Sequence, residues 1–527
     1  MGFYVSPGVY TREKDISDII PNISTTTSAL VGYSTKGSIT NIKLITNSQQ
    51  FINEYGEPVP GEYFHYSALA FLENGTRLYC LRVIKNALYG GCKIAYSEGT
   101  NASFTTGLET PNFQIISGEN NLFFVCGKDP GTWNNKIGIR ITNLNVTDYE
   151  FDIEVYYQDE DGNYQKVETW TVSRKTKVDG YGKQMYLETA INGFSDYIVV
   201  SDNTDQADTV MPLPQSTTLA CAQGSNGSAV TDSELSTGWD KFANPDDVDI
   251  RLLINGGYTS VNTQQKLKTI AESRKDCIAL LDIPYTQLTS VDSMVTWREN
   301  TQNFNSSYCA LYAPWVKIYD QWNDKIIEVP PSGYVASQIA YNDYVAEAWF
   351  APAGFNRGLL NILGLTDVFT QGERDSLYEG QINPLQTFRG QGNVIWGQKT
   401  EQTKASALDR VNVRRLLIIL EKSISASLKY FVFEPNSDLT RYRVTSMIES
   451  YMDMLQARGA FQTEVGGTGY RVLCDTTNNT PAIIDRNELH VDIFIKPIRA
   501  AEFIQLQAII TTTGASFNEL IAKGVMF

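Results

Sequence analysis

Histidine is nearly absent from this sequence of 527 residues, which contains only His65 and His490. Two histidines so far apart argue against a multi-histidine metal site and against a histidine-based catalytic triad. The motifs HExxH, GxSxG and GxxxxGK[ST] are missing too. His490 stands in LHVDIFIKP (489–497), where apolar and polar residues alternate, so we predict that it points outward from a strand. The sequence therefore predicts no catalytic, metal-binding or cofactor-binding residues, and no enzyme.

Paired cysteines, long apolar runs and an excess of basic charge are missing as well. The seven cysteines include no CxxC pair, which predicts reduced, mostly buried thiols in a protein made in a cytoplasm. The run Leu416–Leu420 is far too short to cross a bilayer, and the first residues, MGFYVSPGVYTREKD, show no signal-peptide pattern. We therefore expect no membrane insertion. The formal net charge of −16 argues against general nucleic-acid binding.

The patterns that are present predict a multi-domain α/β and α+β protein. Residues 1–22 are rich in turn formers and strand formers, which is typical of an extended arm. Residues 23–90 and 216–400 form the expected α/β core domain, with a strand at 28–32, a helix at 64–72 and a strand at 77–84. Strands at 248–254 and 277–283 flank a helix at 263–274, so we predict one βαβ unit and a parallel sheet.

Two further regions complete the predicted organisation. Residues 91–215 show short alternating runs between Asp, Gly and Asn turns, which predicts an inserted β-rich domain. A polar stretch, AQGSNGS (222–228), leads back to the core, and residues 312–400 read as irregular. Residues 401–527 return to clear helix and strand patterns and form the expected C-terminal domain, with strand-prone runs at 489–497 and 502–513.

A set of short motifs, taken in order, resembles one known family. They are PGVY (7–10), TSALVGYSTKG (27–37), LYCLRV (78–83), PGTWNN (130–135), LLDIP (280–284), YAPWV (312–316), PPSGYVA (330–336), APAG (351–354), WGQKT (396–400), VNVRRL (411–416), FEPN (433–436), DTTNNTP (475–481) and IKP (495–497). Together they are similar to the tail sheath proteins of contractile-tailed bacteriophages. No single motif is decisive, but their order along almost the whole chain is specific.

The resemblance implies a structural subunit without enzymatic activity. Such subunits polymerise as stacked six-fold rings around an inner tail tube, in an extended metastable state. Contraction, released at the baseplate, drives the tube through the host envelope for genome delivery. The expected partners are other copies of the chain, the tube protein, and the baseplate and tail terminator proteins. The expected location is the virion, after assembly in the host bacterial cytoplasm, with the C-terminal domain near the tube and the β-rich domain outside.

Terminal arms link neighbouring subunits in the implied family by adding strands to each other's sheets. The strand-forming residues of the N-terminal arm are the candidates for this contact: Phe3, Tyr4, Val5, Val9 and Tyr10. Main-chain pairing suits a helical polymer because its interfaces are heterologous and do not close on themselves. A disordered terminus is the alternative interpretation.

A second hypothesis concerns the contact with the inner tube. The periodicity predicts a helix from about Asp409 to Phe433, ending before Pro435. Its apolar side comprises Val413, Leu416, Leu417, Leu420, Ile424, Leu428 and Phe431. Arg415, Lys422 and Lys429 form a stripe on the opposite side, with Ile418 and Ile419 beside it. The stripe is either a solvated face or a basic strip that docks on an acidic tube surface.

Other function classes stay open on the sequence alone. A tube, baseplate or capsid protein would not explain the ordered motifs, and an adhesin would not need the C-terminal region. An envelope-degrading hydrolase could use two of the scattered carboxylates.

Overall fold

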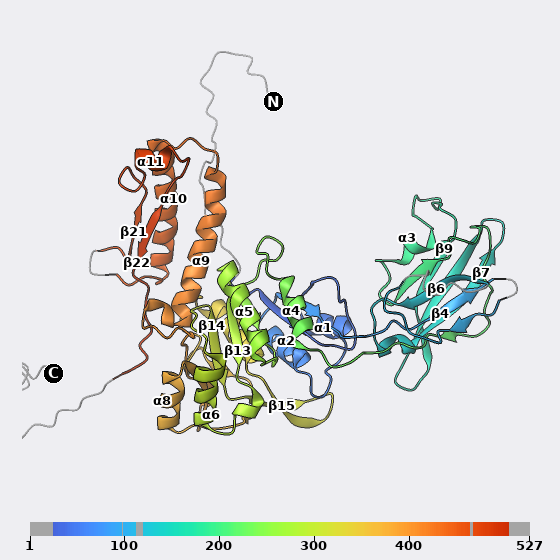
Figure 1. Cartoon of the computed structure of the whole chain (residues 1–527), viewed down its shortest axis with the longest axis horizontal. Helices are drawn as coiled ribbons and strands as arrows, with labels where there is room; N and C mark the ends of the chain where they lie inside the picture. Colours follow the sequence, from blue (N-terminus) through green and yellow to red (C-terminus); the bar gives the residue numbers. More distant parts are fainter. Residues whose placement is uncertain (1–24, 97–98, 112–119, 464–466, 505–527) are drawn as a thin grey trace, which may run out of the picture.

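The computed structural model describes residues 25–96, 99–111, 120–463 and 467–504. It shows a central α/β body, a β-rich domain reached by two chain segments, and a C-terminal domain in which helix α9 rises from the central body (Figure 1). The prediction of a multi-domain protein of mixed α/β structure is confirmed. All seven cysteines are free and buried, as predicted.

A nine-stranded sheet forms the centre of the central body. Five consecutive pairings at its middle, from β3 through β1, β12, β13 and β14 to β19, are parallel, and the outer ones are antiparallel. The middle strands are buried on both faces, which explains why β13 reads as the unbroken apolar run IALLD. In sheet order the strands are β17 (Leu359–Leu360), β20 (Gly392–Ile395), β19 (Ile382–Phe388), β14 (Cys309–Ala313), β13 (Ile278–Asp282), β12 (Leu252–Ile254), β1 (Ser28–Gly32), β3 (Leu78–Arg82) and β2 (Lys43–Ile45).

Helices cover both faces of this sheet. One face packs against α1 (Ser48–Tyr55), α2 (Phe64–Leu72) and α7 (Ser332–Val345). The other face packs against α4 (Asp232–Asp240), α5 (Val261–Arg274), α6 (Val291–Thr296) and α8 (Gln371–Glu379). Side chains cap several of these helices: the Ser260 hydroxyl accepts a hydrogen bond from the Thr263 amide at the start of α5. A small sheet of β16 (Lys325–Val329), β15 (Val316–Asp320) and β18 (Gly364–Leu365) contributes to the same apolar core as α1, α2 and α7.

The β-rich domain consists of two antiparallel four-stranded sheets around one apolar core. The first sheet contains β10 (Ile198–Asp202), β6 (Asn121–Gly127), β4 (Gly91–Ala95) and β5 (Ala102–Ser103). The second contains β11 (Leu219–Ala220), β7 (Ile137–Asn145), β8 (Glu150–Gln158) and β9 (Tyr164–Ser173). The short helix α3 (Leu187–Ile191), which no periodicity had indicated, packs on the same core.

The connection to the β-rich domain is an ordered antiparallel ladder rather than a loose linker. Lys85 pairs with Ser228, Leu88 with Ser225 and Gly91 with Ala222. The polar stretch 222–228 is therefore one strand of a two-stranded stalk. At its root the buried Arg82 guanidinium donates to the carbonyl oxygens of Ser34 (2.7 Å), Gly37 (3.0 Å) and Pro130 (2.8 Å). These bonds fix the stalk to the central body.

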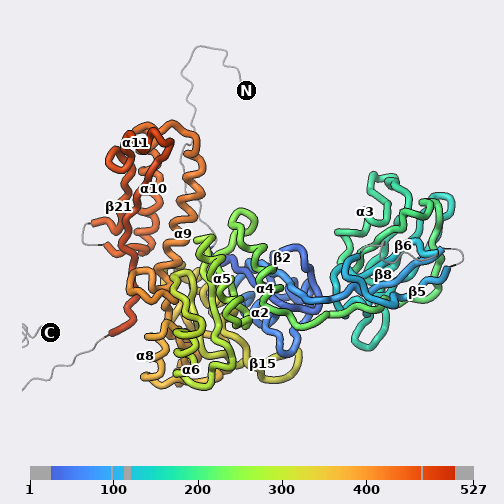
Figure 2. Tube along the Cα trace, in the orientation of Figure 1, coloured from blue at the N-terminus to red at the C-terminus, as the bar shows by residue number. Residues whose placement is uncertain are grey.

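The C-terminal domain packs α9 (Val411–Leu428) and α10 (Asp438–Ala457) against the two-stranded sheet of β21 (Tyr470–Leu473) and β22 (Asp492–Ile495). The 3-10 turn η6 (Lys429–Phe431) extends α9, and α11 (Pro481–Ile484) lies between the two strands in sequence. Figure 2 shows the chain running on from β22 to the side of α8. The predicted apolar side of α9 is confirmed, because Leu416, Leu420 and Ile424 are buried in this core.

Several sequence predictions agree with the structure and others do not. The helix at 64–72 is confirmed, and β12, α5 and β13 form the predicted βαβ unit with parallel strands. The prediction that 312–400 is irregular is wrong, since it contains α7, α8 and several strands. Residues 332–340 of helix α7 are all buried, so this part of its sequence shows no amphipathic pattern. The strand at 489–497 is shorter than predicted; His490 lies just before β22 and is exposed.

Candidate functional site at the junction of helix α9 with the central body

Helix α9 joins the C-terminal domain to the central body through cationic side chains. Arg414 and Arg415 are buried, and Lys422 is half-buried. All three point to the central body, away from the apolar core that α9 shares with α10. Ile418 lies on the same side and packs into the core of the central body. Helix α9 is thus enclosed on two sides.

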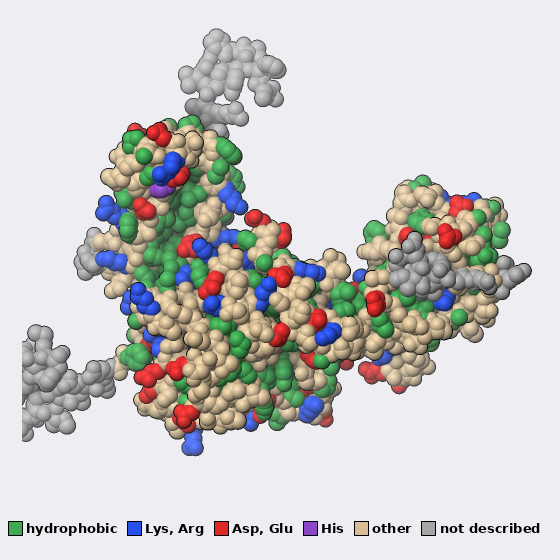
Figure 3. All heavy atoms as spheres, viewed as in Figure 1, with side chains coloured by type: hydrophobic (Ala, Val, Ile, Leu, Met, Phe, Trp, Pro, Cys, Tyr) green, Lys and Arg blue, Asp and Glu red, His purple; other side chains and the backbone are tan. Residues whose placement is uncertain are grey.

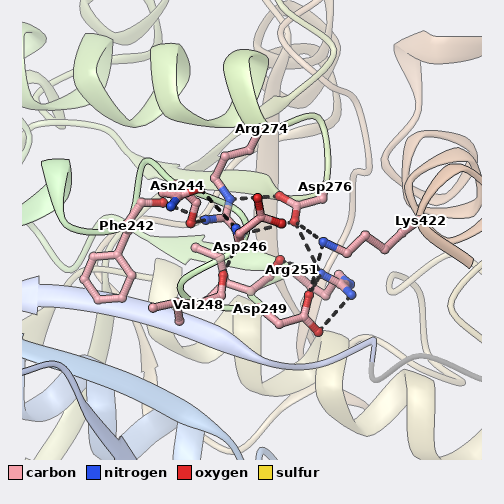
Figure 4. A network of polar contacts seen from close by, with 10 residues as sticks. Phe242, Asn244, Asp246, Val248, Asp249, Arg251, Arg274, Asp276 and Lys422 are labelled. Atoms are coloured by element: carbon pink, nitrogen blue, oxygen red, sulfur yellow. Dashed lines mark hydrogen bonds and ion pairs between the residues drawn. The ribbon is translucent and has the colours of Figure 1, made fainter. Parts of the chain in front are cut away.

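A group of charged residues beneath α9, which we term the junction cluster, consists of Asp249, Arg251, Arg274, Asp276 and Lys422 (Figure 4). Arg274 ends α5 and its side chain is fully buried. Its guanidinium donates to both Asp276 carboxylate oxygens (2.8 and 3.1 Å). The other donors reach the carbonyl oxygens of Phe242, Asn244 and Val248 at 2.7–2.9 Å. Each N–H of this guanidinium therefore has a partner, as a buried charge requires.

Asp276 connects three cations within the cluster. Besides Arg274, it lies 2.9 Å from the Lys422 ammonium and 3.7 Å from the Arg251 guanidinium. The local backbone explains its position: Lys275 adopts φ +60°, which ends α5 and turns the chain into β13. Asp276 is 6% exposed, so its negative charge is screened little by solvent.

Asp249 forms the outer edge of the cluster. It receives two hydrogen bonds from Arg251 (2.8 and 3.1 Å) and lies 3.4 Å from Lys422. Burial works to raise the pKa of Asp249, but Arg251 and Lys422 outweigh it and hold that pKa below its ordinary value. The carboxylate is therefore ionised at neutral pH and gives Lys422 a second counter-charge. Lys422 thus ties α9 to the segment before β12 and to the segment after α5.

A second contact fixes the other end of the junction. Arg415 and Asp343 form a bidentate ion pair, and both side chains are 4% exposed. Asp343 belongs to α7, so this pair joins that helix of the central body to α9. Arg415 also donates to the carbonyl oxygens of Ala348 (3.3 Å) and Thr25 (3.4 Å). Bidentate pairs of this kind are strong and directional.

The predicted basic stripe is wrong for Arg415. The residue is buried against α7, because the side of α9 opposite its apolar face packs on the central body and does not face solvent. Lys422 is half-buried and paired in the junction cluster, and only Lys429, past the end of α9, is exposed. Figure 3 shows basic and acidic side chains mixed over the visible face of this region. A tube contact for Lys422 and Lys429 stays a prediction.

The partners of these cations, Asp249, Asp276 and Asp343, were not predicted from the sequence. A signal was present in the sequence, since the apolar residues Ile418 and Ile419 lie beside the predicted stripe, and the structure shows both of them buried. The arm residues Phe3, Tyr4, Val5, Val9 and Tyr10 lie outside the described residues, as does most of 502–513.

A further buried carboxylate, Glu401, lies just before the C-terminal domain. It is fully buried 3.6 Å from Arg298. Burial raises the pKa of Glu401 to about 7, against the opposing effects of Arg298, Gln302 and Lys268. Since the unfolded chain ionises near its ordinary value, the folded state binds more protons between about pH 4.5 and 7. Glu401 therefore contributes stability at low pH that is lost as the pH rises toward 7.

We expect Glu401→Gln to reduce this pH dependence. Wild type should lose on the order of 2 kcal/mol more free energy of unfolding than the variant when the pH is raised from 5 to 8, because the glutamine amide has no proton to lose. Chemical denaturation at both pH values measures the difference. Glu379→Gln, an exposed position, is the control. Equal pH dependence in wild type and Glu401→Gln would contradict the assignment.

The two histidines lie in different surroundings: His490 is exposed just before β22, and His65 belongs to α2. His65 is fully buried among the rings of Phe51 and Phe64, and burial lowers its pKa to about 4. In the part of the chain that the structure describes, no three His, Cys, Asp or Glu residues are arranged to hold a metal ion. Over the same residues, every helix is too short or too polar to cross a bilayer.

Two family profiles match the central and C-terminal parts of the chain. Residues 228–401 match the family profile described as phage tail sheath protein central domain, and residues 403–511 match the phage tail sheath C-terminal domain. The boundary between them falls between Glu401 and α9. The chain is 34% identical over 372 residues to the tail sheath protein of Enterobacteria phage T4, covering 66% of this chain and 54% of that protein. A tail sheath protein of Vibrio phage KVP40 is 34% identical over 323 residues, 56% of this chain and 47% of that protein.

The chain spans about half the length of the curated relatives it matches. Solved structures share its fold over a larger part. The sheath tail protein Lin1278 from Listeria innocua aligns with a TM-score of 0.57 at 13% identity, over 90% of this chain and 95% of that one. The helical sheath of the anti-feeding prophage in its contracted state aligns with a TM-score of 0.56 at 17% identity, over 96% and 99%.

Proposed function

Since the chain belongs to the phage tail sheath family, we propose that it polymerises helically around an inner tail tube and contracts to drive that tube through the host envelope. The observation that carries the proposal is the consecutive match of sheath central and C-terminal domains over 228–511. The chain is then a virion component, assembled in the host bacterial cytoplasm, with no enzymatic role. Its further partners are the tube, baseplate and tail terminator proteins, and it contacts neither nucleic acid nor membrane directly.

The junction beneath α9 fits a protein that transmits force. A contracting subunit has to move its C-terminal and central domains together, because slack between them would absorb the motion. Arg415–Asp343 and the junction cluster join the two domains through buried or half-buried ionic contacts with fixed partners. The β-rich domain is proposed to lie outside the tube-proximal parts, since its ordered stalk carries it away from α9 (Figure 1).

Contacts between subunits are proposed to use main-chain pairing. Within the described residues the sheet of β21 and β22 has only two strands, and such a sheet is marginal by itself. Strands from the arms of neighbouring copies would extend it, with Phe3, Tyr4, Val5, Val9 and Tyr10 as the N-terminal contribution. The match of the C-terminal profile up to residue 511 agrees with a role for the residues after β22 in the same assembly.

Negative-stain electron microscopy of the purified chain tests the proposal. Long polymers of uniform width are expected. Stable monomers that cleave envelope glycans would instead favour the hydrolase considered from the sequence.

Deletion of residues 2–20 is expected to give a folded, soluble subunit that does not polymerise. The core begins at Ser28, so the deletion leaves its strands intact while removing the arm. Circular dichroism checks the fold and negative-stain microscopy checks the polymer. In a matched variant, a Gly/Ser segment of equal length replaces 2–20 and should also fail to polymerise. Normal sheaths from either variant would refute the role of the arm.

A further inference from the structure

The last described residues of the chain are held to the central body at one carboxylate. Within the described residues, the last backbone hydrogen bond that the chain makes to the C-terminal domain after β22 runs from the Ile498 amide to the Ala460 carbonyl (3.1 Å). Four residues later, Glu502 accepts two hydrogen bonds from Arg410, at 2.7 and 2.9 Å. The Tyr378 hydroxyl and the Gln398 side-chain amide each donate to it at 3.0 Å. Glu502 thus has four donors from three separate segments.

The surroundings show that this carboxylate, and not apolar packing, holds the segment. Phe503 and Ile504 are 83% and 87% exposed. Two hollows border residues 499–503: one of about 510 Å³ lies toward residues 405–413, and one of about 340 Å³ lies toward Tyr378 and Trp396. The segment therefore crosses the surface with open space beside it. A bidentate Arg–carboxylate pair with both side chains about one-fifth exposed is among the stronger ionic contacts available near a surface.

We propose that Glu502 anchors the C-terminal segment to its own subunit, so that only the residues after it can reach a neighbouring copy. We make this inference on the premise of the function proposed above, in which terminal arms link the subunits. Arg410 stands directly before α9, and Tyr378 is on α8. The anchor therefore fixes the start of the segment that links two subunits, which we call the link, close to the junction of α9 with the central body. Rotation of one subunit would then be transmitted directly to its neighbour through the link.

Loss of the anchor would change the reach of the link. The last fixed residue would move from Glu502 back to Ile498, which adds four residues, or about 13 Å of extended chain. A longer link between two subunits allows a wider range of distances between them. We therefore expect sheaths without the anchor to be irregular or absent, while the subunit itself stays folded.

Charge reversal at the two partners tests the anchor. In Glu502→Arg and in Arg410→Glu, like charges replace the ion pair; Glu502→Arg with Arg410→Glu restores opposite charges. Thermolysin cleavage between 498 and 504, followed by mass spectrometry, measures release of the segment in the purified protein. Each single variant is expected to be cleaved about tenfold faster than wild type, and the double variant at a rate close to wild type. Glu379→Arg, an exposed change one residue from Tyr378, is the matched control.

The two readouts separate the anchor from the proposed function. Faster cleavage and disordered sheaths in the single variants, both restored in the double variant, would support the anchor. Cleavage of the single variants at the rate of Glu379→Arg would overturn it, whatever the polymers look like. If wild type forms no polymer, the proposed function fails, and cleavage still decides whether Glu502 holds the segment.

Discussion

Asp276→Ala is expected to lower the free energy of unfolding by about 3–5 kcal/mol. The substitution leaves Arg274 fully buried without its counter-charge, and it removes the nearest anion from Lys422. Removal of one partner from a buried ionic network costs much more than the network contributes as a whole, because the remaining charge stays desolvated. Chemical denaturation measures the change.

Two control variants identify the origin of the effect. Asp247→Ala removes an exposed carboxylate nearby and should change stability by less than about 0.5 kcal/mol. Lys422→Met removes only the ionic contact between the cluster and α9. Because the Lys422 side chain is 28% exposed, the free energy of unfolding should fall by about 1 kcal/mol or less. If Asp276→Ala were as stable as Asp247→Ala, the junction cluster would have no structural role.

The sequence predicted most of the scaffold because its signals are local. The apolar run of β13 and the spacing around α5 are enough to indicate a βαβ unit, and the apolar side of α9 follows from its periodicity. Helix α7 was missed because residues 332–340 are all buried, which removes over most of its length the contrast between faces on which a helix prediction depends.

The polar contacts of the site could not be predicted in the same way. Arg415 and Asp343 are 72 residues apart, and Lys422 and Asp276 are 146 apart. Nothing in either local sequence identifies the other partner, so a buried arginine on a helix looks like a solvated one. Ile418 and Ile419 were the only local evidence that this side of α9 is covered. The ordered stalk at 222–228 was missed for a related reason, since its pairing partner is residues 85–91.

Arg415→Ala and Asp343→Ala are each expected to lower the free energy of unfolding by about 3–5 kcal/mol, since each leaves one buried charge unpaired. The double variant Arg415→Ala with Asp343→Ala removes both charges and should lose clearly less free energy of unfolding than the sum of the two single losses, because no unpaired charge remains. Denaturation of all three variants in parallel gives the coupling free energy between the two positions.

Lys429→Ala separates the two interpretations of α9. Lys429 continues the predicted stripe but is exposed, so its substitution should change stability by less than about 0.5 kcal/mol. If Arg415 belonged to a solvated or tube-facing stripe, Arg415→Ala would be equally mild and its effect would emerge only in assembly around the tube. A large loss in the free energy of unfolding of the isolated subunit would instead show that Arg415 stabilises the packing of α9 on α7. The C-terminal domain would then be fixed to the central body before any partner binds, as rigid transmission of the contraction requires.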